Sequence, residues 1–246
     1  MIGKLKKLNI FGGLWLVLFL QACHEPRRPK NLQLETFELE VPPFRKLKVE
    51  GNFEVEIQPS NRNYALFEGN EECLKAIVMD WKGDTLLIAL EAGFKPLITP
   101  RLCLDYQRLD GIYLMGNGKL ESPQPLIFDH LEVVLSGLSD LCLTLDVLYL
   151  NMEMEGAGTM QLEGRARRVK AQLLGAGGLR AAGLLMDQAE IQVKGMGGAI
   201  VRVAEELKAE VSGIGGILCL QKPVVLKQKV TGAGRVEIQE ENEKLK

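Results

Sequence analysis

A glycine doublet that returns about every nineteen residues constrains this fold more than any other feature of the sequence. One residue separates the two glycines of each copy. The copies are Gly116 with Gly118, Gly156 with Gly158, Gly175 with Gly177, Gly195 with Gly197, Gly213 with Gly215 and Gly232 with Gly234. A variant copy begins at Gly137 and has Ser139 in the second place, so that successive first glycines are 21, 19, 19, 20, 18 and 19 residues apart. Such a constant period is typical of stacked structural repeats.

Apolar residues alternate with polar ones on both sides of each doublet. Two residues before the first glycine stand Leu114, Leu135, Met154, Leu173, Val193, Val211 and Val230. Four residues after it stand Leu120, Leu141, Met160, Leu179, Ala199, Ile217 and Val236. This period of two predicts a strand with one buried face on each side of the doublet. Two strands leave no room in nineteen residues for a helix of three turns.

Without helical crossovers, consecutive units can pair only by winding as a coil. The sequence therefore predicts an all-β fold, a right-handed, single-stranded parallel β-helix of about seven 19-residue coils over residues 109–238.

Both glycines of each doublet are expected to be structural corners. A bend between two strands needs backbone angles that L-residues avoid, and a stacked corner leaves little room for Cβ atoms. Ser139 shows that the second glycine is not absolutely required. A phosphate-binding loop would need a helix after it. A calcium-binding β-roll would need a nine-residue period and recurrent aspartates, but only Asp140 follows a doublet.

Residues 37–108 are less regular and form a β-rich opening segment in this interpretation. Segments 37–41 and 47–57 alternate as strands do, and 61–63 resembles a hairpin turn. Asn70 is a candidate N-cap for a short helix through Val78. We expect this segment to cover the first apolar edge of the stack and the charged tail, 239–246, to blunt the last one.

The N-terminus predicts export. A basic start with Lys4, Lys6 and Lys7 precedes an apolar run, 14–20, that is too short to span a bilayer. Residues 1–22 are therefore predicted to be a signal peptide. The following Leu-Gln-Ala-Cys resembles a bacterial lipobox, which implies a lipid on Cys23 and anchoring at the outer membrane; the alternative is a plain signal cut near Ala22. Residues 23–36 are polar and contain proline, as expected of a tether.

Charge and cysteine content exclude some classes. Removing the three lysines of the signal lowers the formal net charge from −2 to −5, which disfavours nucleic-acid binding. Cys142 and Cys219 belong to coils four apart, roughly 19 Å at about 4.8 Å per coil, too far for a disulfide. A disulfide between Cys73 and Cys103 stays open.

No catalytic, metal or cofactor site emerges from the spacing of reactive residues. Glu153 and Glu155 point the same way from one strand, a pair that glycoside hydrolysis could use, but the pattern favours two solvated acids. Arg165, Arg167 and Arg168 cluster in an expected turn between two coils. The histidines, His24 and His130, have no nucleophile or metal partner at a readable spacing.

The outward positions of the strands before the doublets carry mostly polar residues. Five before the first glycine stand Glu132, Asn151, Lys170, Glu190, Lys208 and Lys227, and three before it the residues are also mostly charged or polar. These rows of mixed sign, without aromatic residues, are typical of a solvated face. On the inward face, Gln228 is the one polar residue among the positions compared.

The strand–GxG–strand repeats in an exported chain resemble the auto-transporter adhesin head GIN domain family of Bacteroidota. The opening LKVEG, the segment FEVEI and the later GDTLLI match the usual order of motifs in that family. The resemblance covers roughly residues 37–238 and implies a β-helix with an adhesion role. Family members usually have an aspartate after each doublet, which this chain keeps only at Asp140.

Three functions follow as hypotheses. The first is a non-catalytic, lipid-anchored binding or adhesion module of the cell envelope with a glycan or protein ligand. The second is a carbohydrate-active β-helix enzyme, a polysaccharide lyase or hydrolase, that uses Glu153 or Glu155. The third is a purely structural envelope protein. The sequence leaves the ligand, the membrane face and the oligomeric state open.

Overall fold

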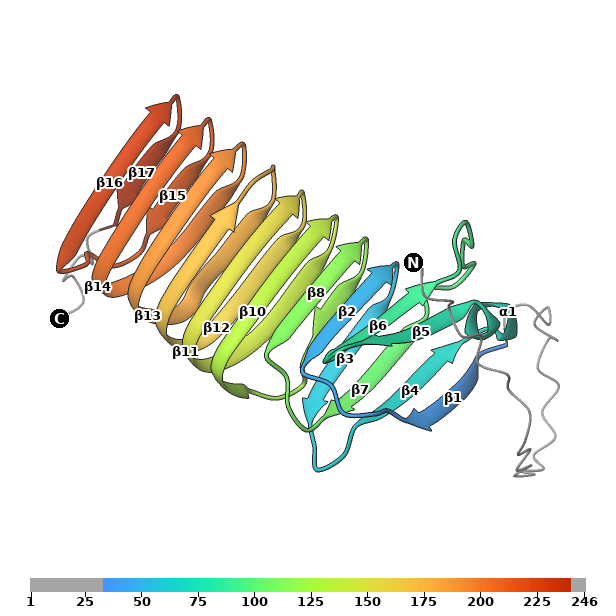
Figure 1. Cartoon of the computed structure of the whole chain (residues 1–246). Helices are drawn as coiled ribbons and strands as arrows, with labels where there is room; N and C mark the ends of the chain where they lie inside the picture. Colours follow the sequence, from blue (N-terminus) through green and yellow to red (C-terminus); the bar gives the residue numbers. More distant parts are fainter. Residues whose placement is uncertain (1–32, 240–246) are drawn as a thin grey trace, which may run out of the picture.

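The computed structural model describes residues 33–239 as a stack of parallel β-coils (Figure 1). This part of the chain contains seventeen strands and one short helix. The coils follow one another like rungs along one axis, and the cap with the helix lies at the end opposite the last coil. The predicted all-β stack of parallel coils is confirmed.

Each coil contributes to two sheets. We call the sheet formed by residues before the glycine corners sheet 1, and the sheet formed by residues after them sheet 2. The long strands of the repeat bend and belong to both. For example, β11 (Asp140–Gly156) pairs through its first residues with β9 (Lys119–Glu121) in sheet 2 and through its later residues with β10 (Leu126–Gly137) in sheet 1.

The same pattern continues along the stack. The following strands are β12 (Thr159–Leu173), β13 (Gly178–Gly195), β14 (Gly198–Gly213), β15 (Gly216–Cys219), β16 (Val225–Gly232) and β17 (Arg235–Ile238). They pair in parallel, and the predicted ladder of apolar residues is in register. Leu135 is opposite Met154, Met154 is opposite Leu173, and the ladder runs on to Val230. These side chains are buried in every coil except the last, where Val230 is 43% exposed.

The backbones approach closely at the corners. Gly156 has φ +135°, and a Cβ atom there would lie 2.1 Å from the carbonyl oxygen of Gly137 in the preceding coil. A Cβ atom at Gly158 would lie 1.8 Å from the carbonyl oxygen of Ser139. Ser139 itself is buried and donates its hydroxyl to the Gly116 carbonyl at 3.2 Å. Only a residue without a side chain fits at Gly156 and Gly158.

The two glycines of a doublet differ in backbone conformation, which corrects part of the expectation for the corners. The first glycine has a positive φ in every copy except Gly175, so the backbone angles that L-residues avoid belong to the first place. The second glycines have no positive φ; they are Gly118, Gly158, Gly177, Gly197, Gly215 and Gly234. The bend therefore needs a special φ at one residue of the doublet, and Ser139 can occupy the second place without backbone strain.

Close approach, rather than backbone angle, restricts the second place of the doublet. A Cβ atom would lie 2.9 Å from the Phe53 carbonyl oxygen at Gly118, and 2.1 Å from Met154 Sδ at Gly177. In the later coils the obstacle is the carbonyl oxygen of the preceding second glycine, at 2.3 Å for Gly197, 2.1 Å for Gly215 and 2.4 Å for Gly234. The expected lack of room for Cβ thus applies to both places of the doublet.

One coil lies outside the predicted repeat. β2 (Lys46–Gly51) pairs in parallel with β8 (Gly111–Gly116), so that Gly51 is opposite Gly116. Gly51 has φ +113°, and the chain then turns into β3 (Glu54–Pro59). The extended segment 47–57 is therefore two strands around a corner. Phe53, which is fully buried, stands where the second glycine would be, and this substitution hides the corner from a search for doublets.

The order of coils in space differs from their order in the sequence. β6 (Thr85–Leu90) and β7 (Arg101–Tyr106) pair with β2 and β3 on one side, while β8 and β9 pair with them on the other. The coil formed by β2 and β3 therefore lies between two segments that both follow it in the chain.

Antiparallel strands cap this end. β5 (Ile77–Lys82) pairs with β6, β4 (Tyr64–Gly69) pairs with β7, and β1 (Glu35–Glu40) pairs with β4. The predicted hairpin at 61–63 is wrong, because β7 occupies the edge of β3 and β4 adds beyond it. The helix α1 (Glu71–Lys75) follows Asn70 but is shorter than predicted, since pairing with β6 begins at Ile77.

Several predictions concern residues outside the described range. The signal 1–22, the lipid site Cys23, His24, most of the tether and the tail 240–246 all fall there. Within residues 33–239, no helix has the length and apolar character needed to cross a membrane.

Candidate functional site

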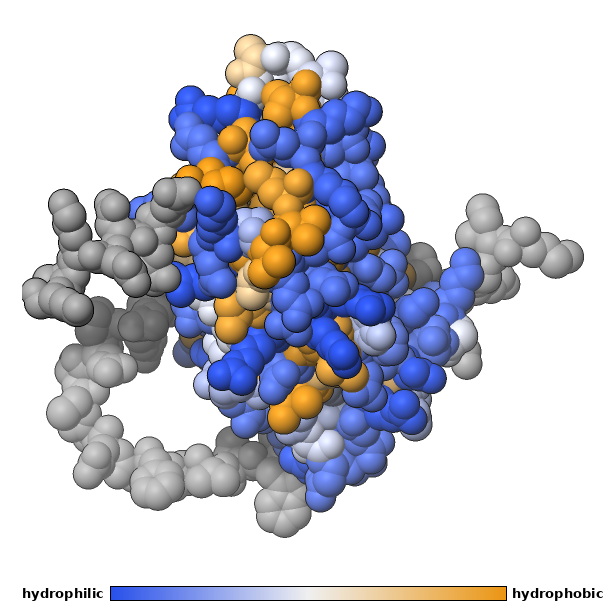
Figure 2. Space-filling view, turned by 90° about the vertical axis from the view of Figure 1, so that its left-hand side faces the viewer, coloured by the Kyte–Doolittle hydropathy of each residue, from blue (hydrophilic) through white to orange (hydrophobic). Residues whose placement is uncertain are grey.

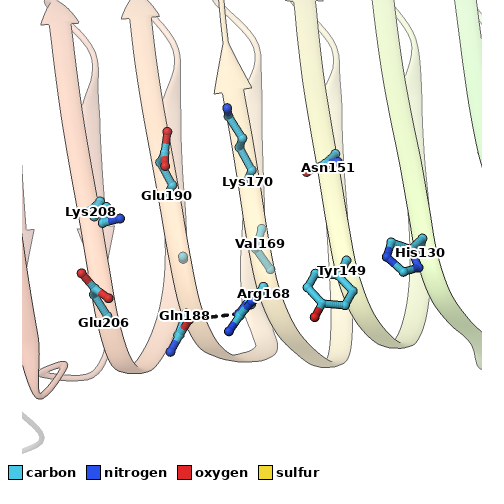
Figure 3. A pocket seen from close by; sticks show the side chains of 11 residues that line it. His130, Tyr149, Asn151, Arg168, Val169, Lys170, Gln188, Glu190, Glu206 and Lys208 are labelled. Carbon is cyan, nitrogen blue, oxygen red and sulfur yellow. Dashed lines mark hydrogen bonds between the residues drawn. The ribbon is translucent and has the colours of Figure 1, made fainter.

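A shallow polar groove lies on the outer face of sheet 1, close to the bend where the chain enters this sheet (Figure 3). Its floor receives one outward side chain from each of five successive coils, which we call the outer ladder. The outer ladder consists of His130, Tyr149, Arg168, Gln188 and Glu206. The groove has a volume of about 290 Å³.

The first four members of the outer ladder interact with one another in sequence. The rings of His130 and Tyr149 stack with centroids 4.6 Å apart and an interplanar angle of 14°. The guanidinium carbon of Arg168 lies 5.7 Å from the centroid of the Tyr149 ring, within cation–π range. Arg168 Nε donates a hydrogen bond to Gln188 Oε1 at 3.2 Å, and Gln188 Nε2 donates one to Glu205 Oε2 at 3.3 Å. These contacts fix the side chains before any ligand arrives.

A second row runs beside the outer ladder, two residues closer to the corners. It contains Asn151, Lys170, Glu190 and Lys208, in the order that the sequence predicted for this row. Figure 3 shows both rows projecting from the same face of the strands. The groove is therefore lined by amides and by charges of both signs.

The cations and the carboxylates of the groove are not matched. Lys227 from the next coil holds the Glu206 carboxylate at 2.8 Å, and its hydrogen bond lowers the pKa of Glu206. By contrast, Arg168, Lys170 and Lys208 form no ion pair with a carboxylate of residues 33–239. An anionic group could thus enter the groove without breaking an ion pair of Arg168, Lys170 or Lys208.

The groove includes only some of the residues that the sequence singled out. Glu153 and Glu155 are exposed on β11 outside it, opposite Gln172 and Ser136 of the adjacent coils. Both carboxylates face solvent, so nothing in their burial distinguishes one acid from the other.

The arginine cluster is divided, because only Arg168 lines the groove while Arg165 and Arg167 do not. The expected turn around these arginines is wrong. Strand β12 continues through all three because the bend keeps its ladder of hydrogen bonds with the neighbouring coils.

The sequence interpretation missed the aromatic pair. It followed the outward positions five and three residues before each doublet, whereas the outer ladder stands seven before it. The two rows compared lack aromatic residues, but the outward face as a whole carries the pair His130 and Tyr149. A readable signal existed, because His130, Tyr149 and Arg168 are each one period, nineteen residues, apart.

The cysteines of the described part are free thiols. Cys73 is buried in α1 and Cys103 is partly buried in β7, and the disulfide between them that the sequence left open is not formed. Burial raises the pKa of both thiols, so they stay protonated and weakly nucleophilic near neutral pH. Across residues 33–239, no three His, Cys, Asp or Glu side chains are grouped as metal ligands.

Comparison with known families decides the assignment. The family described as "Putative auto-transporter adhesin, head GIN domain" matches residues 43–223. The chain belongs to this family. The head GIN match takes in the β2–β3 coil, the cap except β1, and the repeat as far as the segment after β15. No curated protein sequence matches the chain.

Solved structures of other proteins share the head GIN fold. A "putative adhesin" from Bacteroides fragilis superposes with a TM-score of 0.80 at 22% identity, over 84% of this chain and 97% of that one. A "putative lipid binding protein" from Parabacteroides distasonis gives 0.68 at 17% identity, over 83% and 96%. A "putative adhesin" from the same species gives 0.65 at 21% identity, over 85% and 98%. These likenesses establish the fold, and none of the names is that of an enzyme.

Proposed function

We propose that this head GIN protein is an exported, non-catalytic binding module of adhesion type, anchored in the outer membrane by a lipid on Cys23. Membership of the head GIN family supports an exported protein of adhesion type. The lipid anchor rests on the Leu-Gln-Ala-Cys sequence alone.

We propose further that the groove on sheet 1 binds a glycan that carries acidic groups. The observation that carries this proposal is the set of three cations, Arg168, Lys170 and Lys208, on one open face without ion-pair partners in residues 33–239. Carboxylate or sulfate groups of a sugar would receive charge-assisted hydrogen bonds from them. The amides of Asn151 and Gln188 could bind sugar hydroxyls, because an amide both donates and accepts.

The ladder architecture suits such a ligand. Successive coils present equivalent positions about 4.8 Å apart, so a linear polymer along the stack would meet a row of similar contacts. The stacked contacts within the outer ladder reduce the side-chain entropy that binding would otherwise cost. A rigid, shallow and repetitive surface favours binding over catalysis, because it does not enclose a substrate.

A binding measurement with matched variants tests the ligand proposal. The purified protein should bind acidic glycans on an array, and Arg168→Ala or Tyr149→Ala should weaken binding at least about tenfold, roughly 1.4 kcal/mol. Arg180→Ala, on the exposed face of sheet 2, is the control and should leave affinity unchanged. Equal loss in the Arg168 and Arg180 variants would move the ligand elsewhere, and the absence of saturable glycan binding would reject the proposal.

Fractionation of cells tests the anchor. The wild-type protein should sediment with outer membranes and take up labelled palmitate, and Cys23→Ser should abolish the label. Protease shaving of intact cells then shows which face of the membrane displays the domain. A protein without label would overturn the anchor but leave the glycan proposal standing.

A further inference from the structure

The last coil leaves its share of the apolar core uncovered. Leu226 and Val230 are 39% and 43% exposed, whereas Leu207 and Val211, which occupy the same ladder positions one coil earlier, are fully buried. Figure 2 faces the end of the molecule that carries the last coil. It shows a band of hydrophobic side chains down the middle with hydrophilic side chains on both sides. Contiguous apolar surface of this kind marks interaction sites.

The hydrogen-bonding edges at this end are open as well. Within residues 33–239, β16 pairs only with β14, and β17 pairs only with β15. The opposite end of the stack is closed by the antiparallel strands β1, β4 and β5. An open edge beside an apolar core is a template for strand addition.

We propose that the last coil is a dimerisation surface on which a second copy of this chain docks end to end. A two-fold axis perpendicular to both sheets would place β16 antiparallel to β16 of the second copy. The same axis would place β17 antiparallel to its own copy. The interface is isologous, which means that both copies use the same surface. A single two-fold axis therefore covers the apolar end of each copy and pairs the open edges of β16 and β17.

Gln228 favours this partner and sets the register. It faces inward at a position occupied by Ala209 in the preceding coil, and it is exposed at the open end. With the two-fold axis at Gln228, the amide meets the amide of Gln228 of the second copy, and each can donate to the other. Leu226 then lies opposite Val230 of the second copy. A single polar residue in an apolar seam is a known means of fixing register.

The charges at the edge are compatible with this register at a modest cost. Lys227 and Lys229 would face each other across the two-fold axis on the outer surface. Lys227 is held by Glu206 at 2.8 Å and Lys229 by Glu210 at 3.4 Å, so each lysine brings a carboxylate to the junction. The arrangement is a row of alternating charges rather than four free lysines.

Residues 240–246 offer little to cover this end. Residues 240–246 have the sequence EENEKLK, in which Leu245 is the one apolar residue. A segment so polar cannot bury the apolar ladder of a whole coil. A second copy supplies an apolar surface of identical size and shape.

Sedimentation equilibrium of the chain, purified from membranes in a density-matched detergent, tests the dimer. The wild type should have twice the protein mass of one chain. The Val230→Lys variant should have the mass of a single chain. Val224→Lys is the matched control, because Val224 is 85% exposed just outside β16 and lies off the inward ladder. An unchanged circular dichroism spectrum of the variants would show that the fold is retained.

A cross-link in intact cells tests the register independently. Gln228→Cys should give an intermolecular disulfide above the wild-type background, whereas Ala209→Cys, buried one coil inside, should not. A monomeric wild type overturns the proposal, and β16 amides protected from exchange in that monomer would assign the cover to residues 240–246. A dimer that survives Val230→Lys, or an oligomer larger than a dimer, also overturns it.

Discussion

At the scale of single residues, the stack is limited by how closely its corners approach. The first glycine of most corners combines a positive φ with a neighbouring carbonyl oxygen where Cβ would stand; at Gly195 and Gly213 these contacts would be 2.6 and 2.4 Å. The positive φ and the close carbonyl oxygen are independent constraints, and each disfavours any residue with a side chain. By contrast, Gly178 follows the doublet and has neither, since a Cβ atom there would meet nothing nearer than 3.8 Å.

This contrast gives a matched pair of substitutions. Gly156→Ala should lower the free energy of unfolding by about 2–4 kcal/mol, because it adds backbone strain and forces adjacent coils apart. Gly178→Ala should change it by no more than about 0.5 kcal/mol. Urea denaturation of both variants measures the difference. Equal effects would mean that the corners yield easily and that the close contacts do not require glycine.

At the scale of elements, each strand divides its side chains between a ladder inside the stack and a surface outside it. Strand β10 illustrates the division within a few residues. Leu135 is 1% exposed in the inner ladder, while Leu138 is 59% exposed at the corner that follows. Identical side chains three positions apart therefore differ in almost all of their burial.

Truncation of these two leucines should reveal that difference in energy. Leu135→Ala removes buried methyl groups from a ladder flanked by Leu114 and Met154, and it should cost about 2–5 kcal/mol. Leu138→Ala should stay within about 0.5 kcal/mol of the wild type. Thermal and urea unfolding give the values. A large loss at Leu138 would contradict the division and would indicate that the corner residue is covered in solution.

The sequence predicted the repeat well because the residues of each ladder recur at a fixed spacing along the chain. Alternation and spacing were enough to place Leu173 opposite Val193 and to identify the corners. They were not enough for the Gly51 corner, where Phe53 breaks the doublet and the partner strand lies far along the chain. The aromatic pair of the groove was also missed, although its period was visible, because it lies at the second bend of the coil.

At the scale of the whole molecule, the two ends of the stack are built differently. One end is capped by the antiparallel strands β1, β4 and β5. The other end is a regular coil without a cap in residues 33–239. Terminal units of repeat proteins normally need such a cover to remain soluble and folded. The loss of either end should therefore have unequal consequences.

Deletion from the two ends tests this asymmetry. Removing residues 223–246 deletes β16 and β17 and leaves the coil of β14 and β15 as the open end. Thermal unfolding, monitored by circular dichroism, should stay cooperative. Removing residues 37–110, with the signal and tether retained, exposes the edges of β8 and β9 without a cap and should abolish cooperative unfolding. A cooperative transition in the second variant would show that the repeat folds without its cap.

The position of the β2–β3 coil between later segments also determines when the molecule can form. A chain that leaves a secretion channel from its N-terminus presents residues 46–59 early, but the flanking strands are complete only when residue 121 has emerged. Until then, β2 and β3 keep an unpaired edge after export and are prone to aggregate. A chaperone that binds unfolded chains would be most useful at this stage. From residue 126 onward each coil finds a finished neighbour as it appears, so assembly can keep pace with export.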